Sequence, residues 1–473
     1  FQVLVAAVGD LGGQDSVAAR ETAWRWLRLA LGLTLIGALV SDLTRHRRAP
    51  PAWLGAILLA ALAMLWTRLT LRPELISYAL LALLLGRIEA SLRDTSDEAL
   101  WRRLLDPRRA GGQATFITLA WSQFHGFAAL APLLWLLAGL LDRGPLAVAA
   151  RWRHCLAGAA FALLANAATP NGPAALLYPL RVLAQFGTDR PDLAATIAEL
   201  VPLLDTRGSL AATLVVFKAS LIWGAVWVVL GWPRRSWTRV AIWLLAIGAA
   251  WQGQRNLGLY AVAFVLLHGG PITSADDLAS RLIRRWAPRG ADRRAHVAVT
   301  AVATAGLATV ALLWLGGIAS DRFYLREGVA RRFGPGLTPA NYPLAVANEL
   351  TGRPVGRVAN TVDAASSIIW YDAGRVAIDG RTEAYPPEVW REYREFRGGG
   401  STALALLDRW QADAVCLAHR NPASHAVLRT LRSSQDWRLA AADAAGVTYL
   451  RSRVSAPGET GPEERLRTGA RTT

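Results

Sequence analysis

The chain has 473 residues, of which 53% are hydrophobic and 20 are tryptophan, and its mean hydropathy is +0.26. Soluble domains of this size are rarely so apolar, so the composition favours membrane spans over an ordinary soluble enzyme. The formal charge of +17 is carried almost wholly by arginine, and many arginines cluster between apolar runs. Nucleic acid is therefore not an expected partner, since its binding needs a basic face on a soluble module.

Apolar runs recur along the first 318 residues. They fall at 1–8, 24–40, 52–66, 75–86, 115–141, 155–168, 209–230, 240–251, 257–267 and 296–318. The last run is the clearest single span, because roughly 20 apolar residues suffice to cross a bilayer. The mixed stretch 169–205 is expected to lie partly along the membrane surface as amphipathic helix. The chain begins inside an apolar stretch without a charged leader, so we expect a fragment that lacks part of an N-terminal membrane region.

Polar residues interrupt three of the apolar stretches. The interruptions are Arg72-Pro73-Glu74, Gln123-Phe124-His125-Gly126 and Gln252-Gly253-Gln254-Arg255-Asn256. An unpaired polar group facing hydrocarbon costs on the order of several kcal/mol. We therefore expect the chain to bend at each interruption and to carry the polar residues at the tip of a hairpin.

Arginine-rich connections set the predicted topology. They are 45–48, 87–109, 143–153, 234–239 and 281–294. The positive-inside rule places them in the cytoplasm, so the chain must cross the membrane an even number of times between any two of them. All three tips, the stretch 169–205 and everything after residue 318 are then expected outside. The hairpin arms are shorter than a full span, which predicts broken helices or a locally thinned bilayer.

The composition changes to ordinary polarity after residue 318. Strands are expected at 356–362, 375–379, 413–418, 437–442 and 447–450, and helices at 364–371, 386–396, 402–410 and 422–431. Alternating strands and helices predict a small α/β domain, with Asp363 as a helix N-cap. The predicted fold is an α-helical multi-pass membrane protein with a small C-terminal α/β extracytoplasmic domain. Its divisions are 1–318 (polytopic), 319–452 (α/β) and 453–473 (disordered).

The candidate binding residues are the polar side chains of the three tips. They are Arg72, Glu74, Gln123, His125, Arg255 and Asn256. Arginine suits a phosphate because its planar fork binds two oxygens at once. The alternatives are that the arginines snorkel to lipid headgroups and that Gln123 and His125 cap helix ends. Lys218, inside an apolar run, either snorkels or has a buried anionic partner.

Other kinds of site lack a sequence signal. Cys155 and Cys416 match no metal or redox spacing, and no disulfide between them is expected. No phosphate loop, nucleophile elbow or histidine pair with metal spacing is found. No residue can therefore be named as catalytic from these motifs.

Several of these residues carry a resemblance in their order along the chain. The points of similarity are Arg72-Pro73-Glu74 followed by Ser77, the turn 121–126, Asn171-Gly172, Arg255-Asn256 and the run 375–381. With them the chain resembles bacterial multi-pass membrane proteins related to GT-C-type glycosyltransferases, which use polyprenyl-phosphate donors. Most of those relatives are uncharacterised, so the resemblance implies architecture more firmly than activity.

The resemblance implies a membrane protein of the bacterial cell envelope that binds a lipid-linked sugar donor at the outer face. Cationic residues would hold the donor phosphate, and sugar transfer to an acceptor hydroxyl would be assisted by a divalent metal or a base. The family's catalytic carboxylate lies in the first outer loop, which we expect to be missing here. Asp10 and Asp15 carry no family motif, so the catalytic residues and the cofactor stay unassigned. The alternative is a non-catalytic scaffold or transporter with a partner-binding outer domain.

Overall fold

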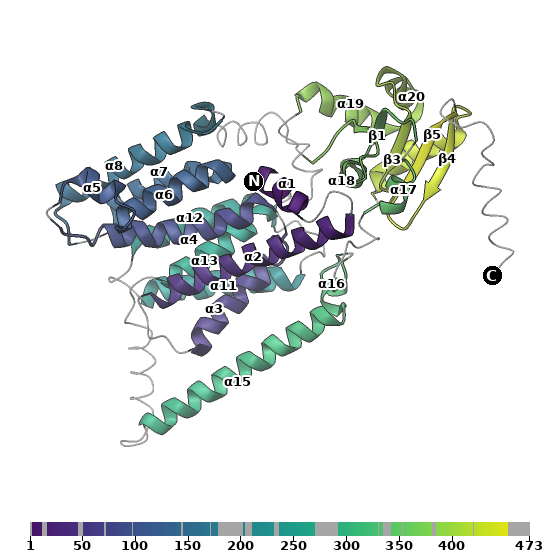
Figure 1. Cartoon of the computed structure of the whole chain (residues 1–473). Coiled ribbons are helices and arrows are strands. Elements are labelled where there is room, and N and C mark those ends of the chain that lie inside the picture. The colour runs from purple at the N-terminus through teal and green to yellow at the C-terminus, as the bar shows by residue number, and fades with distance from the viewer. Residues whose placement is uncertain are drawn as a thin grey trace. The chain divides into compact units, whose positions relative to one another are not determined.

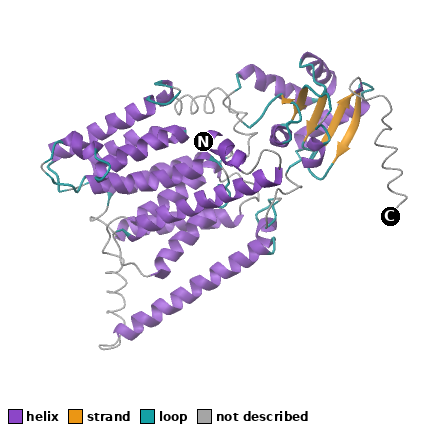
Figure 2. Ribbon diagram, in the orientation of Figure 1, coloured by secondary structure: helices purple, strands orange, loops and turns teal. Residues whose placement is uncertain are grey.

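A computed structural model gives the structure of most of the chain (Figures 1 and 2). It describes residues 2–11, 17–45, 51–70, 72–96, 98–142, 145–170, 172–177, 202–203, 211–230, 236–269, 292–329, 331–333, 342–351, 353–380, 385–419 and 421–452. Several expected features lie outside these ranges. They are the tail 453–473, most of the surface segment 169–205, most of the basic stretch 281–294, Asn171 and Arg381.

The chain divides into two compact units. The first, the helical unit, comprises Phe1–Ile318 and Arg326–Gly328. The second, the α/β unit, comprises Ala319–Leu325 and Val329–Thr473. The short helix α16 (Arg322–Arg326) straddles the division.

The described part of the helical unit is built from helices alone. They are α1 (Gln2–Leu11), α2 (Val17–Thr44), α3 (Pro51–Leu65), α4 (Pro73–Ser91), α5 (Leu100–Leu105), α6 (Ala110–Phe124), η1 (Gly126–Leu130), α7 (Ala131–Leu141), α8 (Val148–Ala167), α11 (Ala211–Leu230), α12 (Trp237–Gln252), η4 (Gln254–Asn256), α13 (Leu257–Gly269) and α15 (Asp292–Ala319). Three stretches in them are long and apolar enough to cross a membrane: Glu21–Thr44, Ala211–Val229 and Ala301–Ala319. The mostly helical character predicted from the sequence is confirmed.

Helix α13 is the centre of the helical unit. All of its residues except the partly buried Leu259 are buried, and it packs against α2, α3, α4, α11 and α12. Figure 1 shows α2, α4, α12 and α13 side by side. A helix that is apolar on all sides must be enclosed by other helices. The apolar core of the unit extends around it, with Tyr78 and Trp121 among the largest fully buried side chains.

The chain bends at all three polar interruptions, as predicted. Helix α4 begins with Pro73 at its first position, which suits a residue whose backbone nitrogen donates no hydrogen bond. Helix α6 ends at Phe124 because His125 is extended, with φ −160° and ψ 144°. Gly253 is extended in the same way between α12 and η4.

One hairpin arm is longer than predicted, because α6 begins at Ala110 and not near residue 115. The reason lies in the turn from α5 to α6, where the backbones approach closely. A Cβ on Gly112 would lie 1.9 Å from the carbonyl oxygen of Asp106. Only glycine permits this packing, so two residues that look like loop start the helix instead.

A five-stranded sheet forms the middle of the α/β unit. Its strands are β1 (Arg357–Asn360), β2 (Arg375–Val376), β3 (Ala414–Leu417), β4 (Trp437–Ala442) and β5 (Val447–Arg451), in the order β2-β1-β3-β5-β4. Strand β1 is parallel to β2 and β3, whereas β5 is antiparallel to β3 and β4. The predicted closing hairpin is confirmed as β4 and β5.

Helices lie on both sides of the sheet, as Figure 2 shows. They are α17 (Leu344–Asn348), α18 (Val362–Trp370), α19 (Pro387–Gly398), α20 (Gly400–Arg409) and α21 (His425–Ser433). One core joins Ile368 of α18 to Val358 and Cys416 of the sheet. Because side chains alternate along a strand, Ala359 and Val415 point to the opposite face.

Two details of the α/β unit differ from the prediction. Thr361, not Asp363, is the N-cap of α18, and Asp363 lies in the first turn, where a carboxylate favours the helix dipole. Strand β2 ends at Val376, where the backbone nitrogen of Ala377 still donates to Val358 O at 3.0 Å and the side chain of Asn360 adds further hydrogen bonds. Its Oδ1 accepts from the backbone nitrogen of Ala377 at 2.9 Å, and its Nδ2 donates to Ile378 O at 2.7 Å.

Candidate functional site

The helical unit has two polar ends, and the first of them holds described arginines of the basic connections, among them Arg45, Arg151 and Arg239. At this end Arg239, at the start of α12, donates to the carbonyl of Leu266, near the end of α13, at 2.6 Å. Thr238 donates in the same way to Leu137, near the end of α7. We call this the basic end. The hairpins α6–α7 and α12–α13 therefore both leave from it and return to it.

The three bends lie together at the other end, which we call the tip end. Trp121, near the end of α6, donates from Nε1 to Ser77 Oγ, near the start of α4, at 3.0 Å. Tyr78 packs against Gly258, near the start of α13, so closely that a Cβ there would lie 2.5 Å from the tyrosine hydroxyl. The 3₁₀ turn η1 also contacts α4 and α8. The bends are thus held side by side by two contacts, Trp121 with Ser77 and Tyr78 with Gly258.

The first bend carries Arg72 and Glu74. Arg72 is the N-cap of α4 and is extended, and Glu74 lies in the first turn of that helix. Both side chains are half-buried. A carboxylate in the first turn is stabilised by the helix dipole. The start of α4 therefore carries one cationic and one anionic side chain, Arg72 and Glu74. Arg68, four residues before Arg72, is more deeply buried, at 6% exposure.

The second bend carries Gln123 and His125. Gln123 is exposed, and its Nε2 donates to Ser122 Oγ at 3.2 Å. His125 is half-buried, accepts a 3.4 Å hydrogen bond from the backbone nitrogen of Phe127 through Nδ1, and lies edge-on against the Phe127 ring. The capping alternative therefore holds for His125, while Gln123 faces outward from the helix end.

The third bend carries Arg255 and Asn256 in the turn η4. Both side chains are half-buried. Asn256 donates from Nδ2 to the carbonyl of Ala249 at 2.8 Å, which ties the turn back to α12. Asn256 therefore shapes the bend, whereas Arg255 presents a cation at the rim. The structure brings all six predicted residues to one end, and it connects them through the buried residues beneath them.

A buried ionic cluster at the basic end was not predicted from the sequence. Arg239 forms ion pairs with Asp42 and with Glu89, each at 2.6 Å, and all three side chains are at most 4% exposed. Ser236 adds hydrogen bonds to Glu89 and Asp142. The sequence had placed Glu89 and Arg239 in loops. The available signal was a single charged residue at the edge of each apolar run, and buried charges of this kind require partners.

A third buried carboxylate, Glu327, was also not predicted from the sequence. It is fully buried and accepts hydrogen bonds from the backbone nitrogen of Ala212 at 2.8 Å and from Thr213 Oγ1 at 3.0 Å. Trp66 Nε1 donates to the same threonine at 2.9 Å. Glu327 therefore serves the first turn of α11, where backbone N–H groups and the helix dipole favour a negative charge.

The connection from α4 to α6 is organised by Asp94. Its carboxylate accepts from Arg109 at 3.1 Å, and the backbone nitrogen of Ser96 donates to it at 3.0 Å. Burial alone would raise the pKa of Asp94, but the hydrogen bonds from Ser96 and the charges of Arg103 and Arg109 outweigh it and lower that pKa. These contacts order part of the basic end.

The chemistry of the described residues supplies no obvious metal centre. Within the part of the chain that the structure describes, no group of three His, Cys, Asp or Glu side chains could hold a metal ion. Lys218 is exposed on α11, which favours the snorkelling alternative. Both cysteines are buried and free.

The fold and the two polar ends define a mostly helical chain with three candidate membrane-spanning helices and a small C-terminal sheet. No protein-family model and no curated protein matches it. Among solved structures it is similar to an archaeal oligosaccharyltransferase from Archaeoglobus fulgidus, solved with an inhibitory peptide and a dolichol-phosphate. The sequence identity is 11% and the TM-score 0.35, over 94% of this chain and 58% of that one. The chain thus spans little more than half the length of that structure.

Proposed function

We propose that the chain is an integral, multi-pass membrane protein of the glycosyltransferase type, which transfers a sugar from a lipid-linked donor at the outer membrane face. The observation that carries this proposal is the convergence of three polar bends at one end of an otherwise apolar helical unit. Ionisable groups next to apolar spans are costly and mark functional sites by default. Here they gather in one place.

The chemistry of the tip end fits a phosphate joined to a sugar. Arg255 and Arg72 offer forked donors of the kind that binds phosphate oxygens in pairs. Gln123 and Glu74 offer neutral and anionic groups suited to sugar hydroxyls. In the proposed complex the polyprenyl chain lies in the bilayer beside the helical unit, and the phosphate meets the arginines at the rim. The catalytic residues and any metal stay unassigned.

The length of α4 supports a membrane setting. This helix, Pro73–Ser91, runs from the tip end to the basic end and has 19 residues. At about 1.5 Å per residue it is roughly 28 Å long. This is close to the hydrocarbon core of about 30 Å, so the two polar ends could lie at the two faces of a bilayer.

The proposed topology follows from the charges. The basic end faces the cytoplasm and the tip end faces outside. Residues 1–318 then form the polytopic domain, 319–452 an extracytoplasmic domain and 453–473 a tail. The setting would be the cytoplasmic membrane of a bacterial cell envelope, with membrane lipid and a polyprenyl-phosphate sugar as partners.

The test is a transfer assay with the full-length protein in lipid nanodiscs. Radiolabelled polyprenyl-phosphate glucose is the donor, and label that leaves the lipid fraction is counted. Arg255→Ala is expected to reduce transfer at least about 100-fold if its charge stabilises the phosphate in the transition state. Arg108→Ala is the matched control, because Arg108 is an exposed arginine at the basic end. If the two variants transfer sugar equally, Arg255 is not part of the site. If the wild type binds the donor without transferring sugar, the result favours the scaffold alternative.

A further inference from the structure

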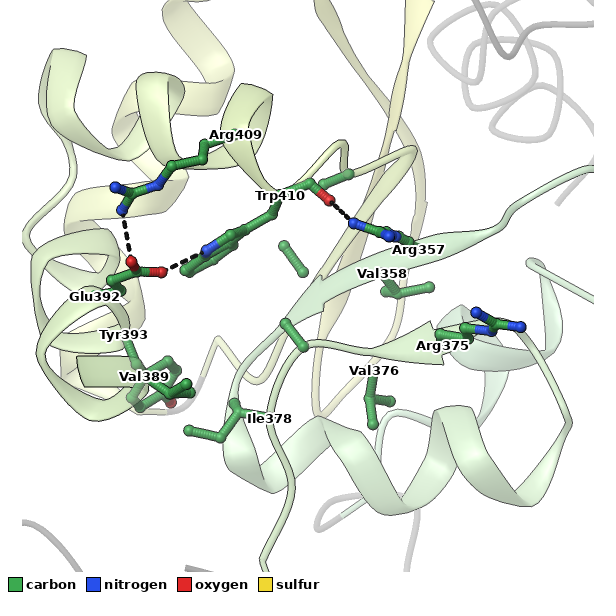
Figure 3. Close-up of a pocket in the computed structure, with 13 residues that line it drawn as sticks. Arg357, Val358, Arg375, Val376, Ile378, Val389, Glu392, Tyr393, Arg409 and Trp410 are labelled. Atoms are coloured by element: carbon green, nitrogen blue, oxygen red, sulfur yellow. Dashed lines mark hydrogen bonds and ion pairs between the residues drawn. The ribbon is translucent and has the colours of Figure 1, made fainter. Parts of the chain in front are cut away.

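The α/β unit contains a pocket of about 460 Å³ that no motif pointed to. Strands β1 and β2 form one wall, and α19 and the end of α20 form the other. Figure 3 shows the charged and aromatic side chains that line it. A cavity of this volume falls within the range of small-molecule sites, roughly 300–1,000 Å³.

Two arginines stand next to each other at one end of the pocket. Arg357 and Arg375 are directly paired in the parallel register of β1 and β2, and Figure 3 shows both side chains at the same end. The backbones of paired residues on neighbouring strands are about 4.8 Å apart. Like charges on two directly paired residues disfavour the pairing, and here water screens part of the repulsion because both side chains are exposed.

Neither arginine forms an ion pair with a carboxylate among the described residues of the unit. Arg357 donates from Nη1 to the carbonyl of Trp410 at 3.2 Å. The carboxylate of Asp413 accepts from the backbone nitrogens of Gly356 and Arg357. Glu392, which lines the pocket, pairs with another arginine, Arg409. The edge of the sheet therefore carries two adjacent cations, and an anion between them would relieve the repulsion.

The opposite end of the pocket is electrically balanced. Glu392 accepts from Trp410 Nε1 and from Arg409, each at 2.9 Å, and Figure 3 shows this group across the pocket from the arginine pair. The indole of Trp410 and the ring of Tyr393 line the space between the two ends. A carboxylate at this end disfavours a ligand that is anionic throughout. The carboxylate of Glu392 can accept hydrogen bonds, the guanidinium of Arg409 can donate them, and the aromatic rings offer flat apolar faces. Together these groups suit a neutral ring that carries hydroxyl groups.

We propose that this pocket binds a phosphorylated sugar. The phosphate lies between Arg357 and Arg375, and the sugar ring lies over Trp410 toward Glu392. The pocket is too large for a phosphate ion alone, and its charge is concentrated at one end, which matches a ligand with one anionic group. The proposal stands on the contacts of the α/β unit and does not depend on the activity proposed for the helical unit.

The first test is binding to the full chain in nanodiscs, measured by calorimetry at low ionic strength. The soluble probes are glucose 1-phosphate, inorganic phosphate and methyl glucoside. Polyprenyl-phosphate glucose incorporated in the nanodisc tests the same headgroup presented by a lipid. Glucose 1-phosphate is expected to bind more tightly than either fragment. Arg375→Ala or Arg357→Ala is expected to weaken it at least about 10-fold, through loss of charge-assisted hydrogen bonds.

The matched control is Arg429→Ala, an exposed arginine on α21 that does not line the pocket. Equal binding by Arg375→Ala and Arg429→Ala would overturn the proposal. Inorganic phosphate that binds as tightly as the sugar phosphate would overturn the part concerning the sugar. The tip end is a second candidate site for the lipid-linked glucose. If Arg255→Ala weakens its binding and Arg375→Ala does not, the lipid-linked sugar binds at the tip end, and this result counts against the pocket as the lipid site.

A stability measurement keeps the proposal testable even if a variant is impaired. Because the two arginines repel each other without a ligand, Arg375→Ala is expected to leave the thermal midpoint of the ligand-free protein unchanged or raise it. Glucose 1-phosphate is expected to raise the midpoint of the wild type and of Arg375→Lys, but not that of Arg375→Ala. A ligand-free Arg375→Ala protein that melts lower than wild type would show that Arg375 is a structural contact and would contradict the proposal.

Discussion

Arg239 donates from Nε to a carboxylate oxygen of Glu89 across 2.6 Å, in a place where both side chains are almost fully buried. The same guanidinium forks onto Asp42 through its two terminal nitrogens. One cation thus joins three helices, α2, α4 and α12, at the basic end. Charges removed from water are costly unless each has a partner, so this contact fixes how the helices meet.

Arg239→Ala is therefore expected to destabilise the helical unit by about 3–5 kcal/mol, since it leaves two carboxylates buried without their cation. Chemical unfolding in detergent, followed by circular dichroism, measures the change. Arg108→Ala is the control and is expected to stay within about 0.5 kcal/mol of the wild type. If leucine replaces Asp42, Glu89 and Arg239 together, more stability should remain than in Arg239→Ala. A single variant as stable as the control would show that the cluster does not hold the helices.

The Trp121–Ser77 hydrogen bond links two of the bends at the tip end. Trp121→Phe keeps the aromatic bulk and removes the donor, so it is expected to cost about 1 kcal/mol. Because the bond lies beneath the candidate binding residues, sugar transfer should fall by more than the loss of folded protein explains. Trp26→Phe is the control, since Trp26 is exposed on α2. Equal stability and equal transfer in the two variants would argue against a tip end positioned by Trp121.

The side chain of Asn360 adds hydrogen bonds where strand β2 ends. Its buried amide contacts Thr361, Ala377 and Ile378. Ala377 N and Thr361 O keep backbone partners in Asn360→Ala, but Ile378 O loses the Asn360 donor. We therefore expect a loss of about 1–3 kcal/mol in the stability of the α/β unit. Thermal unfolding against Asn348→Ala, an exposed asparagine on α17, provides the comparison. No difference between the two would mean that water satisfies the exposed backbone equally well.

Burial in β3 raises the pKa of the Cys416 thiol to about 12. At pH 8 the folded protein therefore holds almost no thiolate there, and maleimide should leave Cys416 unmodified until denaturant is added. The same shift links to stability. As the pH rises above the ordinary thiol pKa of about 8.5, the unfolded chain loses this proton and the folded chain keeps it, so stability falls. Mass spectrometry of the labelled peptide gives the readout, and rapid labelling at pH 8 would contradict the buried assignment.

The sequence predicts most of the element positions because hydrophobic periodicity and turn residues are local signals. The bends at 125 and 253, and the hairpin of β4 and β5, follow from such signals. Boundaries fail where a distant contact decides them. Helix α6 starts early because of a close approach to Asp106, and Thr361 displaces Asp363 as a cap.

The candidate residues divide in a similar way. The six tip residues could be named from the sequence, because each interrupts an apolar run. The Asp42–Glu89–Arg239 cluster and the Arg357–Arg375 pair could not, since their partners are far apart in the chain and meet only through tertiary packing or strand register. Charge next to an apolar run indicates that a partner is needed, but it does not say which residue provides it.

The placement of the two polar ends on opposite sides of a membrane decides whether the tip end can bind an outer lipid-linked sugar. Single cysteines at Gln123 and at Arg108, which are exposed at the tip and basic ends, can be treated with an impermeant maleimide in sealed vesicles. The native cysteines are buried and should not interfere. In right-side-out vesicles Gln123→Cys should be labelled and Arg108→Cys protected, with the reverse in inverted vesicles. Labelling of Gln123→Cys only from the cytoplasmic side would contradict the proposed site.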